Sequence, residues 1–137
     1  MATRAKARGV LYLDSSALVK IVVAERESPA LRRLLQRHRL RVSCALARTE
    51  AVRAVGHLGP RVIARARQVV RRIDLVRLDD ALLDAAGVLD TGVLRSLDAI
   101  HLAAALTVAA QLEAVVTYDA RMADAARFLG LSVAAPA

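Results

Sequence analysis

Short apolar runs that alternate with helical patterns constrain the fold of this chain more than any other feature of its sequence. The expected strands cover residues 10–13, 41–44, 73–78, 114–118 and 131–134. The expected helices cover residues 15–24, a segment that begins at Pro29, and residues 45–58, 61–72, 80–89, 97–112 and 120–129. Strands joined through helices pair in parallel, with the helices on the faces of the sheet. The pattern therefore predicts a three-layer α/β/α domain with a mainly parallel central sheet.

Length and hydropathy favour one globular domain over residues 1–137, with residues 1–9 as a flexible basic tail. Hydrophobic residues make up 56% of the chain, which excludes a disordered protein. The longest apolar stretch, residues 99–110, is too short to span a bilayer. The apolar run near the N-terminus is too short for a signal peptide. These features predict a cytoplasmic protein without a membrane partner.

The charge balance favours an anionic partner. The formal net charge is +8, and 19 of the 21 basic residues are arginines, whose planar forks bind phosphate in a bidentate manner. A GC-rich genome would also produce such a composition. With only three aromatic residues, recognition of nucleic acid would depend on phosphate contacts and shape rather than base stacking. The single cysteine, Cys44, excludes a disulfide within the chain or a thiolate metal cage, and is expected to be a buried structural thiol.

Four carboxylates occur in or beside apolar segments. Asp14 and Asp119 each follow a predicted strand and precede a predicted helix, so both are expected at the edge where open α/β sheets bind ligands. Capping of the following helix is the alternative role for each. Asp98 lies in the first turn of a helix that is apolar on nearly every side, where an unpaired charge would be costly. Small residues flank Glu50 on its predicted helix, so its side chain is expected to lean toward the core. An ion pair to Arg53 is the alternative.

Carboxylate oxygens are the ligands that Mg²⁺ and Mn²⁺ prefer. A bound ion would remove the repulsion between an acidic pocket and a nucleic acid, and it would activate a phosphodiester for hydrolysis. Four carboxylates inside a basic protein therefore favour metal-dependent phosphodiester hydrolysis.

The chain resembles PIN-domain ribonucleases, and more narrowly the VapC toxins of bacterial toxin–antitoxin pairs. The matching segments are YLDSSALVK, RTEAVRA, RSLDAIHLAAAL and VTYDARMADAA, in the order and spacing of the family, and the resemblance spans residues 10–134. It implies a PIN fold, dependence on Mg²⁺ or Mn²⁺, and endonucleolytic cleavage of RNA. It also implies a homodimer and inhibition by a cognate VapB-like antitoxin, whose tail would cover the active site.

The resemblance also assigns roles to individual residues. The family's acidic quartet matches Asp14, Glu50, Asp98 and Asp119. Three of these carboxylates, Asp14, Asp98 and Asp119, are the expected metal ligands, directly or through water. Glu50 is expected to position a metal-bound water or a second ion. Ser16 and Thr117 match supporting hydroxyl positions beside Asp14 and Asp119. Ser15 stands where many relatives carry threonine, and the N-terminal segment is longer than the family needs.

Two other functions remain open. A non-catalytic module that binds RNA or protein would keep the scaffold but gain little from four clustered carboxylates. A structure-specific DNA nuclease would share the chemistry, although this short chain lacks insertions that could clamp a DNA flap. Among weaker signals, Asp90-Thr91-Gly92 is expected to be a loop, His101 a core histidine hydrogen-bonded within its own helix, and Asp124 a solvent-facing residue.

Overall fold

A central sheet of five strands organises the part of the chain that the computed structural model describes, residues 9–90 and 94–137. The strands are β1 (Val10–Leu13), β2 (Arg41–Cys44), β3 (Asp74–Val76), β4 (Leu112–Val116) and β5 (Val133–Ala134). Their order in the sheet is β3-β2-β1-β4-β5, and every neighbouring pair is parallel. The expected α/β fold with a parallel sheet is confirmed.

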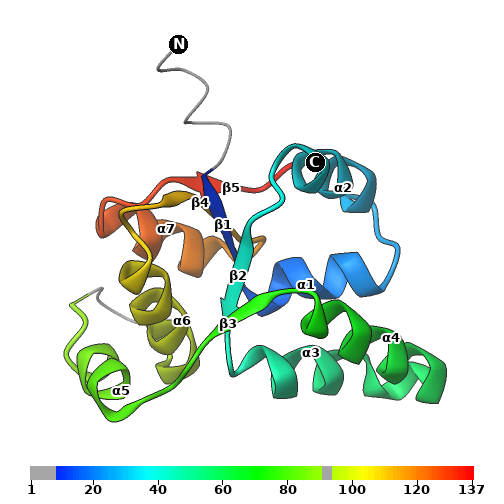
Figure 1. Ribbon diagram of the computed structural model, residues 1–137, viewed down its shortest axis with the longest axis horizontal. Helices are drawn as coiled ribbons and strands as arrows, with labels where there is room; N and C mark the ends of the chain where they lie inside the picture. The colour runs from blue at the N-terminus through cyan, green and yellow to red at the C-terminus, as the bar shows by residue number, and fades with distance from the viewer. Residues whose placement is uncertain (1–8, 91–93) are drawn as a thin grey trace.

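Helices cover both faces of this sheet. They are α1 (Ser15–Val22), α2 (Ser28–Arg37), α3 (Ala47–Val55), α4 (Pro60–Arg71), α5 (Asp80–Gly87), α6 (Ser96–Thr107) and α7 (Ala120–Phe128), with a short 3₁₀ turn, η2 (Gly56–Leu58), between α3 and α4. Figure 1 shows α5, α6 and α7 on one side of the strands and α1, α3 and α4 on the other. Within the described ranges, no helix has the length and apolar character needed to cross a membrane.

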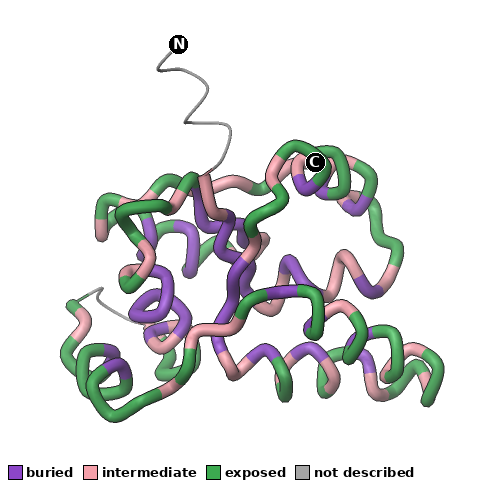
Figure 2. The backbone as a smooth tube through the Cα atoms, viewed as in Figure 1, coloured by how far each residue is buried: buried purple, intermediate pink, exposed green. Residues whose placement is uncertain are grey.

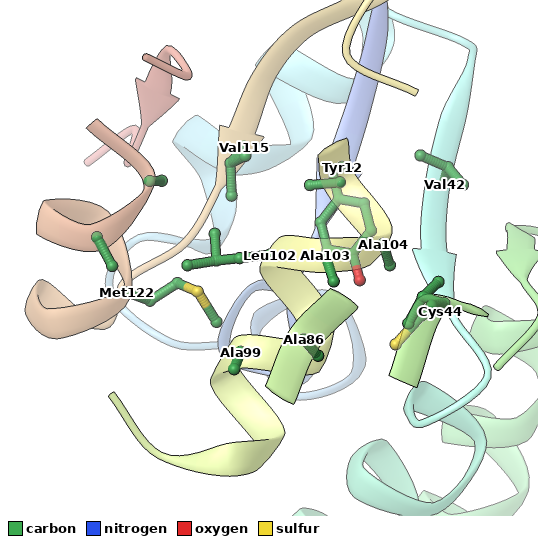
Figure 3. Packing of buried hydrophobic residues seen from close by; sticks show 14 residues of the cluster. Tyr12, Val42, Cys44, Ala86, Ala99, Leu102, Ala103, Ala104, Val115 and Met122 are labelled. Carbon is green, nitrogen blue, oxygen red and sulfur yellow. The ribbon is translucent and has the colours of Figure 1, made fainter. Parts of the chain in front are cut away.

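Alternation along the strands divides the core into two layers, because successive side chains of a strand point to opposite faces. Leu11 and Leu13 of β1 pack in the layer that contains residues of α1, α2 and α3. Tyr12, between them, packs in the other layer, with Leu102 of α6 and Met122 of α7. Figure 2 shows that the buried residues concentrate along the central strands, and Figure 3 shows the packing around Tyr12. The sheet is therefore covered on both faces, as a parallel sheet requires.

The strand order reverses between β1 and β4. The chain proceeds from β1 outward to β2 and β3, then crosses to β4 and continues to β5 on the other side. Ligands of open α/β sheets bind at such a reversal, outside the carboxyl ends of the strands. The backbone N–H of Asp14 donates to the carbonyl of Val116 at 3.3 Å, so the carboxyl ends of β1 and β4 are adjacent.

The largest error in the predicted boundaries concerns α6, which was expected to reach residue 112 and ends at Thr107. The cause is sheet pairing. Leu112 pairs with Val10, and the N–H of Val10 donates to the carbonyl of Gln111 at 2.8 Å, so β4 begins two residues earlier than expected. Residues 108–111 become turns that connect the helix to the strand. Apolar periodicity cannot distinguish a helix from the start of a buried strand at such a junction.

Other boundaries differ by smaller amounts. The helix expected at residues 45–58 is divided into α3 and η2, and α6 begins at Ser96, one residue before its expected start. The expected basic tail at residues 1–9 lies outside the described residues except for Gly9, and so do Thr91 and Gly92 of the expected loop.

Candidate metal and catalytic site

Asp14 joins the end of β1 to the start of α1. Its carboxylate Oδ1 caps the helix by accepting from the N–H of Ala17 at 3.0 Å, so the helix-capping alternative describes one of its contacts. The same oxygen accepts from the Ser16 hydroxyl at 2.6 Å, and Oδ2 accepts from the Thr117 hydroxyl. The residue is only 3% exposed. Asp14 is therefore a buried carboxylate held by three neutral donors.

This environment favours the protonated form of Asp14. Burial raises the pKa of its carboxyl group above the usual range, although the hydrogen bonds from Ser16, Thr117 and the Ala17 amide oppose part of the rise. Within the described ranges, Asp14 forms no ion pair with a basic side chain. The charge of His101 lowers the pKa of Asp14 to a smaller extent, so the anionic form has only a non-contacting cation to offset its desolvation.

Thr117 connects Asp14 to Asp119. Its hydroxyl donates to Asp14 and accepts the backbone N–H of Asp119 at 3.1 Å. Asp119 in turn caps α7, because its Oδ1 accepts from the N–H groups of Arg121 and Met122. The other oxygen, Oδ2, remains available for contacts outside the helix.

Arg95 contacts both Asp98 and Asp119. Its Nε donates to Oδ2 of Asp98 at 3.3 Å, and its Nη2 lies 3.6 Å from Oδ2 of Asp119. Sequence reasoning missed Arg95, although its position three residues before Asp98 in RSLD was a signal for an ion pair at the start of a helix. Arg95 thus supplies one of the partners that a costly charge at Asp98 requires. The Asp98 side chain is 16% exposed and already has a cationic neighbour.

Glu50 lies in the first turn of α3 and contacts His101 of α6. The His101 Nε2 is 2.6 Å from Oε1 of Glu50, whereas no ion pair joins Glu50 to Arg53 within the described residues. The other ring nitrogen of His101, Nδ1, lies 2.8 Å from the Tyr12 hydroxyl and 3.6 Å from the Cys44 thiol. Glu50 is therefore anchored to the core, in the direction that the sequence indicated.

The expected hydrogen-bond partner of His101 was wrong. His101 is 1% exposed and is a core residue, as expected, but its partners come from β1, β2 and α3 rather than from its own helix. Burial alone lowers the pKa of His101, whereas hydrogen bonds with Cys44 and Glu50 raise it, to about 10 overall. A protonated imidazole can donate to Glu50 through Nε2 and to Tyr12 through Nδ1. The lone buried histidine in an otherwise apolar helix was the only sequence signal for this contact.

A cavity of about 630 Å³ lies beside these carboxylates. Its wall includes Ser16 of α1, Glu50 of α3 and Leu97 of α6, so it touches three of the elements that carry site residues. Val19, Leu46 and Ala54 make much of the remaining wall apolar. The cavity gives a ligand access to Glu50 and to the hydroxyl that holds Asp14.

The four carboxylates do not form a closed cage. Asp98 and Asp119 share the Arg95 guanidinium, Asp14 is linked to Asp119 through Thr117, and Glu50 stands apart with His101. Within residues 9–90 and 94–137, no three Asp, Glu, His or Cys side chains lie close enough together to enclose a metal ion. Mg²⁺ is usually held by one or two carboxylates with several waters, and the oxygen donors at this edge fit that mode.

The remaining acidic residues have structural surroundings. Asp124, expected to face solvent, has a side chain that is 82% exposed. Cys44 is fully buried, as expected for a structural thiol. Asp79 caps α5 by accepting from the N–H of Leu82.

Comparison with known proteins identifies the family of this chain. The PIN domain model matches residues 11–128. Ribonuclease VapC46 of Mycobacterium tuberculosis (strain ATCC 25618 / H37Rv) is 49% identical over 126 residues, which cover 92% of this chain and 97% of that protein. Ribonuclease VapC35 of the same strain is 41% identical, and ribonuclease VapC47 of strain CDC 1551 / Oshkosh is 36% identical, each covering 93% of this chain and 97% of the relative. The chain therefore belongs to the PIN domain family, among its VapC-like members.

Proposed function

We propose that this protein is a metal-dependent endoribonuclease that hydrolyses RNA phosphodiester bonds and acts as the toxin of a toxin–antitoxin pair. The observation that carries the proposal is the position of Asp14, whose buried carboxylate lies where the strand order of a VapC-like chain reverses. Asp98 and Asp119 share the Arg95 guanidinium, and Asp119 is linked to Asp14 through Thr117. The relatives named above are all ribonucleases.

Mg²⁺ or Mn²⁺ would be held by Asp14, Asp98 and Asp119, some of them through bound water, and it would supply Lewis-acid polarisation of the scissile phosphate. The chain's own residues orient these groups. Ser16 and Thr117 fix the Asp14 carboxylate through their hydroxyls. Glu50, held by His101, would orient the attacking water and accept its proton.

The activity is tested by incubating the purified protein with single-stranded RNA and Mg²⁺ or Mn²⁺, with and without EDTA. We expect internal cleavage that EDTA abolishes and that Asp14→Asn and Asp98→Asn each lower at least about a hundredfold. The matched control is Asp124→Asn, because that carboxylate is exposed and its ion pair is with Arg127 rather than with a site residue. Undiminished cleavage by both site variants would overturn the proposal. A single-stranded DNA of the same sequence, left uncut, establishes RNA as the substrate.

A cognate VapB-like antitoxin would regulate this activity by covering the carboxylate edge. We place the pair in the cytoplasm, where messenger, transfer and ribosomal RNA are found, and we expect the protein to form a homodimer. Exposed Phe128 and Val88 are apolar residues available for such contacts. Expression without antitoxin should arrest growth, and light scattering should give twice the chain mass. Normal growth with active protein, or a monomeric mass, would contradict these two parts of the proposal.

One observation favours a second candidate, a non-catalytic RNA-binding module. The Arg95 guanidinium partly neutralises Asp98 and Asp119, as an internal countercharge in a protein without metal would do. Arg95 is 69% exposed, so its attraction is screened by water and is weak. Salt-sensitive RNA binding without cleavage in Mg²⁺, Mn²⁺ or Ca²⁺ would favour this module over the nuclease.

A further inference from the structure

A second cavity, of about 380 Å³, lies between α3 and α4. Three arginines surround it, Arg48 from α3 and Arg67 and Arg71 from α4, together with Thr49 and Val70. The two helices pack against each other, as Figure 1 shows, and the buried Val70 belongs to the core beneath. We call this feature the arginine cavity.

The charges of the arginine cavity are not balanced by neighbouring carboxylates. Arg48, Arg67 and Arg71 are exposed, and across the described ranges none of the three is ion-paired. Arg67 and Arg71 are one helical turn apart, so they lie on the same face of α4 and repel each other. Three cations around one concavity are typical of a site for a ligand with several negative charges.

The arginine cavity adjoins the catalytic edge. Thr49 lines both this cavity and the 630 Å³ cavity whose wall includes Ser16 and Glu50. Arg48, Thr49 and Glu50 are consecutive residues of α3, so the helix itself connects the two. A chain molecule that reaches the carboxylates can therefore continue across α3 to the three arginines.

We propose that the arginine cavity binds backbone phosphates of the RNA strand, outside the bond that is cut. This inference rests on the proposed ribonuclease function. A guanidinium fork matches the geometry of a phosphate group and forms two parallel hydrogen bonds with it. Among the described residues that line the cavity none is aromatic, so the cavity would contact the backbone rather than the bases. An acidic peptide would satisfy the same charges, but the continuity with the catalytic cavity favours the substrate strand.

The test measures RNA binding in EDTA by fluorescence anisotropy, with a labelled single-stranded RNA of about 20 nucleotides. The background is Asp98→Asn, which prevents cleavage. Into it we introduce Arg48→Gln, Arg67→Gln and Arg71→Gln together. Loss of three phosphate contacts should lower the slope of log affinity against log salt by about 2, at about 0.7 for each contact to a single strand. The matched control is Arg32→Gln with Arg33→Gln, two exposed arginines of α2 that lie outside both cavities.

An unchanged slope in the triple variant, with circular dichroism showing a folded protein, would overturn the inference. The inference also fails if the triple variant loses affinity only for an Asp- and Glu-rich peptide, since the cavity would then be a peptide site. Cleavage by the protein with its native Asp98 separates this result from the proposed function. If the protein cleaves RNA but the triple variant keeps the slope, the phosphate site is contradicted and the nuclease function is not. If the slope falls but the unaltered protein cleaves no RNA, the nuclease function is contradicted and the phosphate site is supported.

Cleavage kinetics give an independent readout. A dinucleotide substrate has one phosphodiester, the bond that is cut, and leaves no further backbone phosphate for the arginine cavity. The triple variant with native Asp98 should therefore cut it at the rate of the unaltered protein. On an RNA of about 20 nucleotides, KM should rise about tenfold or more while kcat is preserved. An equal loss on both substrates would contradict a role in binding the distant part of the strand.

Discussion

Asp14 and the Asp98–Asp119 pair belong to the same edge of the sheet, yet their surroundings differ. Asp14 is 3% exposed and is held by two hydroxyls and a backbone amide, all neutral. The side chains of Asp98 and Asp119 are 16% and 31% exposed and share the guanidinium of Arg95. One part of the site is thus buried without a contacting basic side chain, and the other is partly solvated with one.

This difference in burial and in surrounding charge shows how the protein without bound metal tolerates an acidic site. An exposed pair such as Arg95 with Asp98 changes stability little, because water screens its charges. A buried carboxylate with a raised pKa, in contrast, disfavours the folded state whenever it is ionised. Asp14 is therefore the group for which function and stability are most directly opposed.

The largest effect is expected from Asp14→Asn, which should abolish cleavage and stabilise the protein in EDTA. Asparagine keeps the helix cap and the size of the side chain but carries no charge. The raised folded pKa means that the contribution of Asp14 to stability is present below its unfolded pKa of 3.8 and is lost as pH rises through the folded value. The gain in unfolding free energy should therefore be absent near pH 3 and grow as pH rises through the folded pKa of Asp14.

Thermal unfolding in EDTA across this pH range measures the gain, at about 3 °C in Tm for each kcal/mol. The comparison breaks down if Asp14→Asn lowers Tm at neutral pH, or if the gain is independent of pH. Asp124→Asn, at an exposed carboxylate, is the control.

His101→Gln tests the anchor of Glu50 and should cost about 1–3 kcal/mol, because it removes one partner from a buried polar contact. The His101 pKa is raised to about 10 from 6.5, so its contribution is fully present below pH 6.5 and disappears as pH rises through 10. In urea unfolding at pH 7, 8.5 and 10, the difference in unfolding free energy between the variant and the unaltered protein should therefore become smaller as pH rises. A constant difference would show that packing, rather than charge, explains the effect. His57→Gln, at an exposed histidine, is the control.

Arg95→Gln tests the Asp98–Asp119 pair, which shares the guanidinium of Arg95. Removing the guanidinium frees Oδ2 of both Asp98 and Asp119, so Mn²⁺ should bind more tightly. An exposed ion pair contributes up to about 1 kcal/mol, which limits the gain to about fivefold. Calorimetric titration with Mn²⁺ measures it, with Arg127→Gln as the control for loss of an exposed arginine. Weaker Mn²⁺ binding in Arg95→Gln would mean that the arginine supports the site rather than competing for it.

The smallest effect is expected for the metal-free stability of Asp98→Asn, which should change by no more than about 0.5 kcal/mol. Its partner is exposed, so the ion pair that it loses was weak. Urea unfolding in EDTA provides the value. A stabilisation as large as that of Asp14→Asn would remove the distinction between the two halves of the site.

Local sequence patterns were sufficient for the bounds of β1 and β2 and for the capping positions of Asp14 and Asp119, because each Asp follows a short apolar run and precedes a helix. They were insufficient for the contacts of His101. Its partners Tyr12, Cys44 and Glu50 are 89, 57 and 51 residues away, and only the sheet order brings them together.

The sequence also did not predict which of the carboxylates is most deeply buried. The apolar helix around Asp98 indicated a deeply buried charge there, whereas the most buried carboxylate is Asp14. The end of a helix can reach solvent even when its middle is core, and α6 is buried mainly from Ala99 to Ala105. The end of α6 at Thr107 was likewise decided by pairing of β4 with β1, which no periodicity within the helix reveals.

The most direct test of the metal site is calorimetric titration of Mn²⁺ into the unaltered protein and into Asp14→Asn, Asp98→Asn, Asp119→Asn and Asp124→Asn. We expect the first three variants each to weaken binding at least about tenfold, which corresponds to about 1.4 kcal/mol, and Asp124→Asn to match the unaltered protein. Equal Mn²⁺ affinity in all five proteins would contradict the assignment of this sheet edge as the metal site.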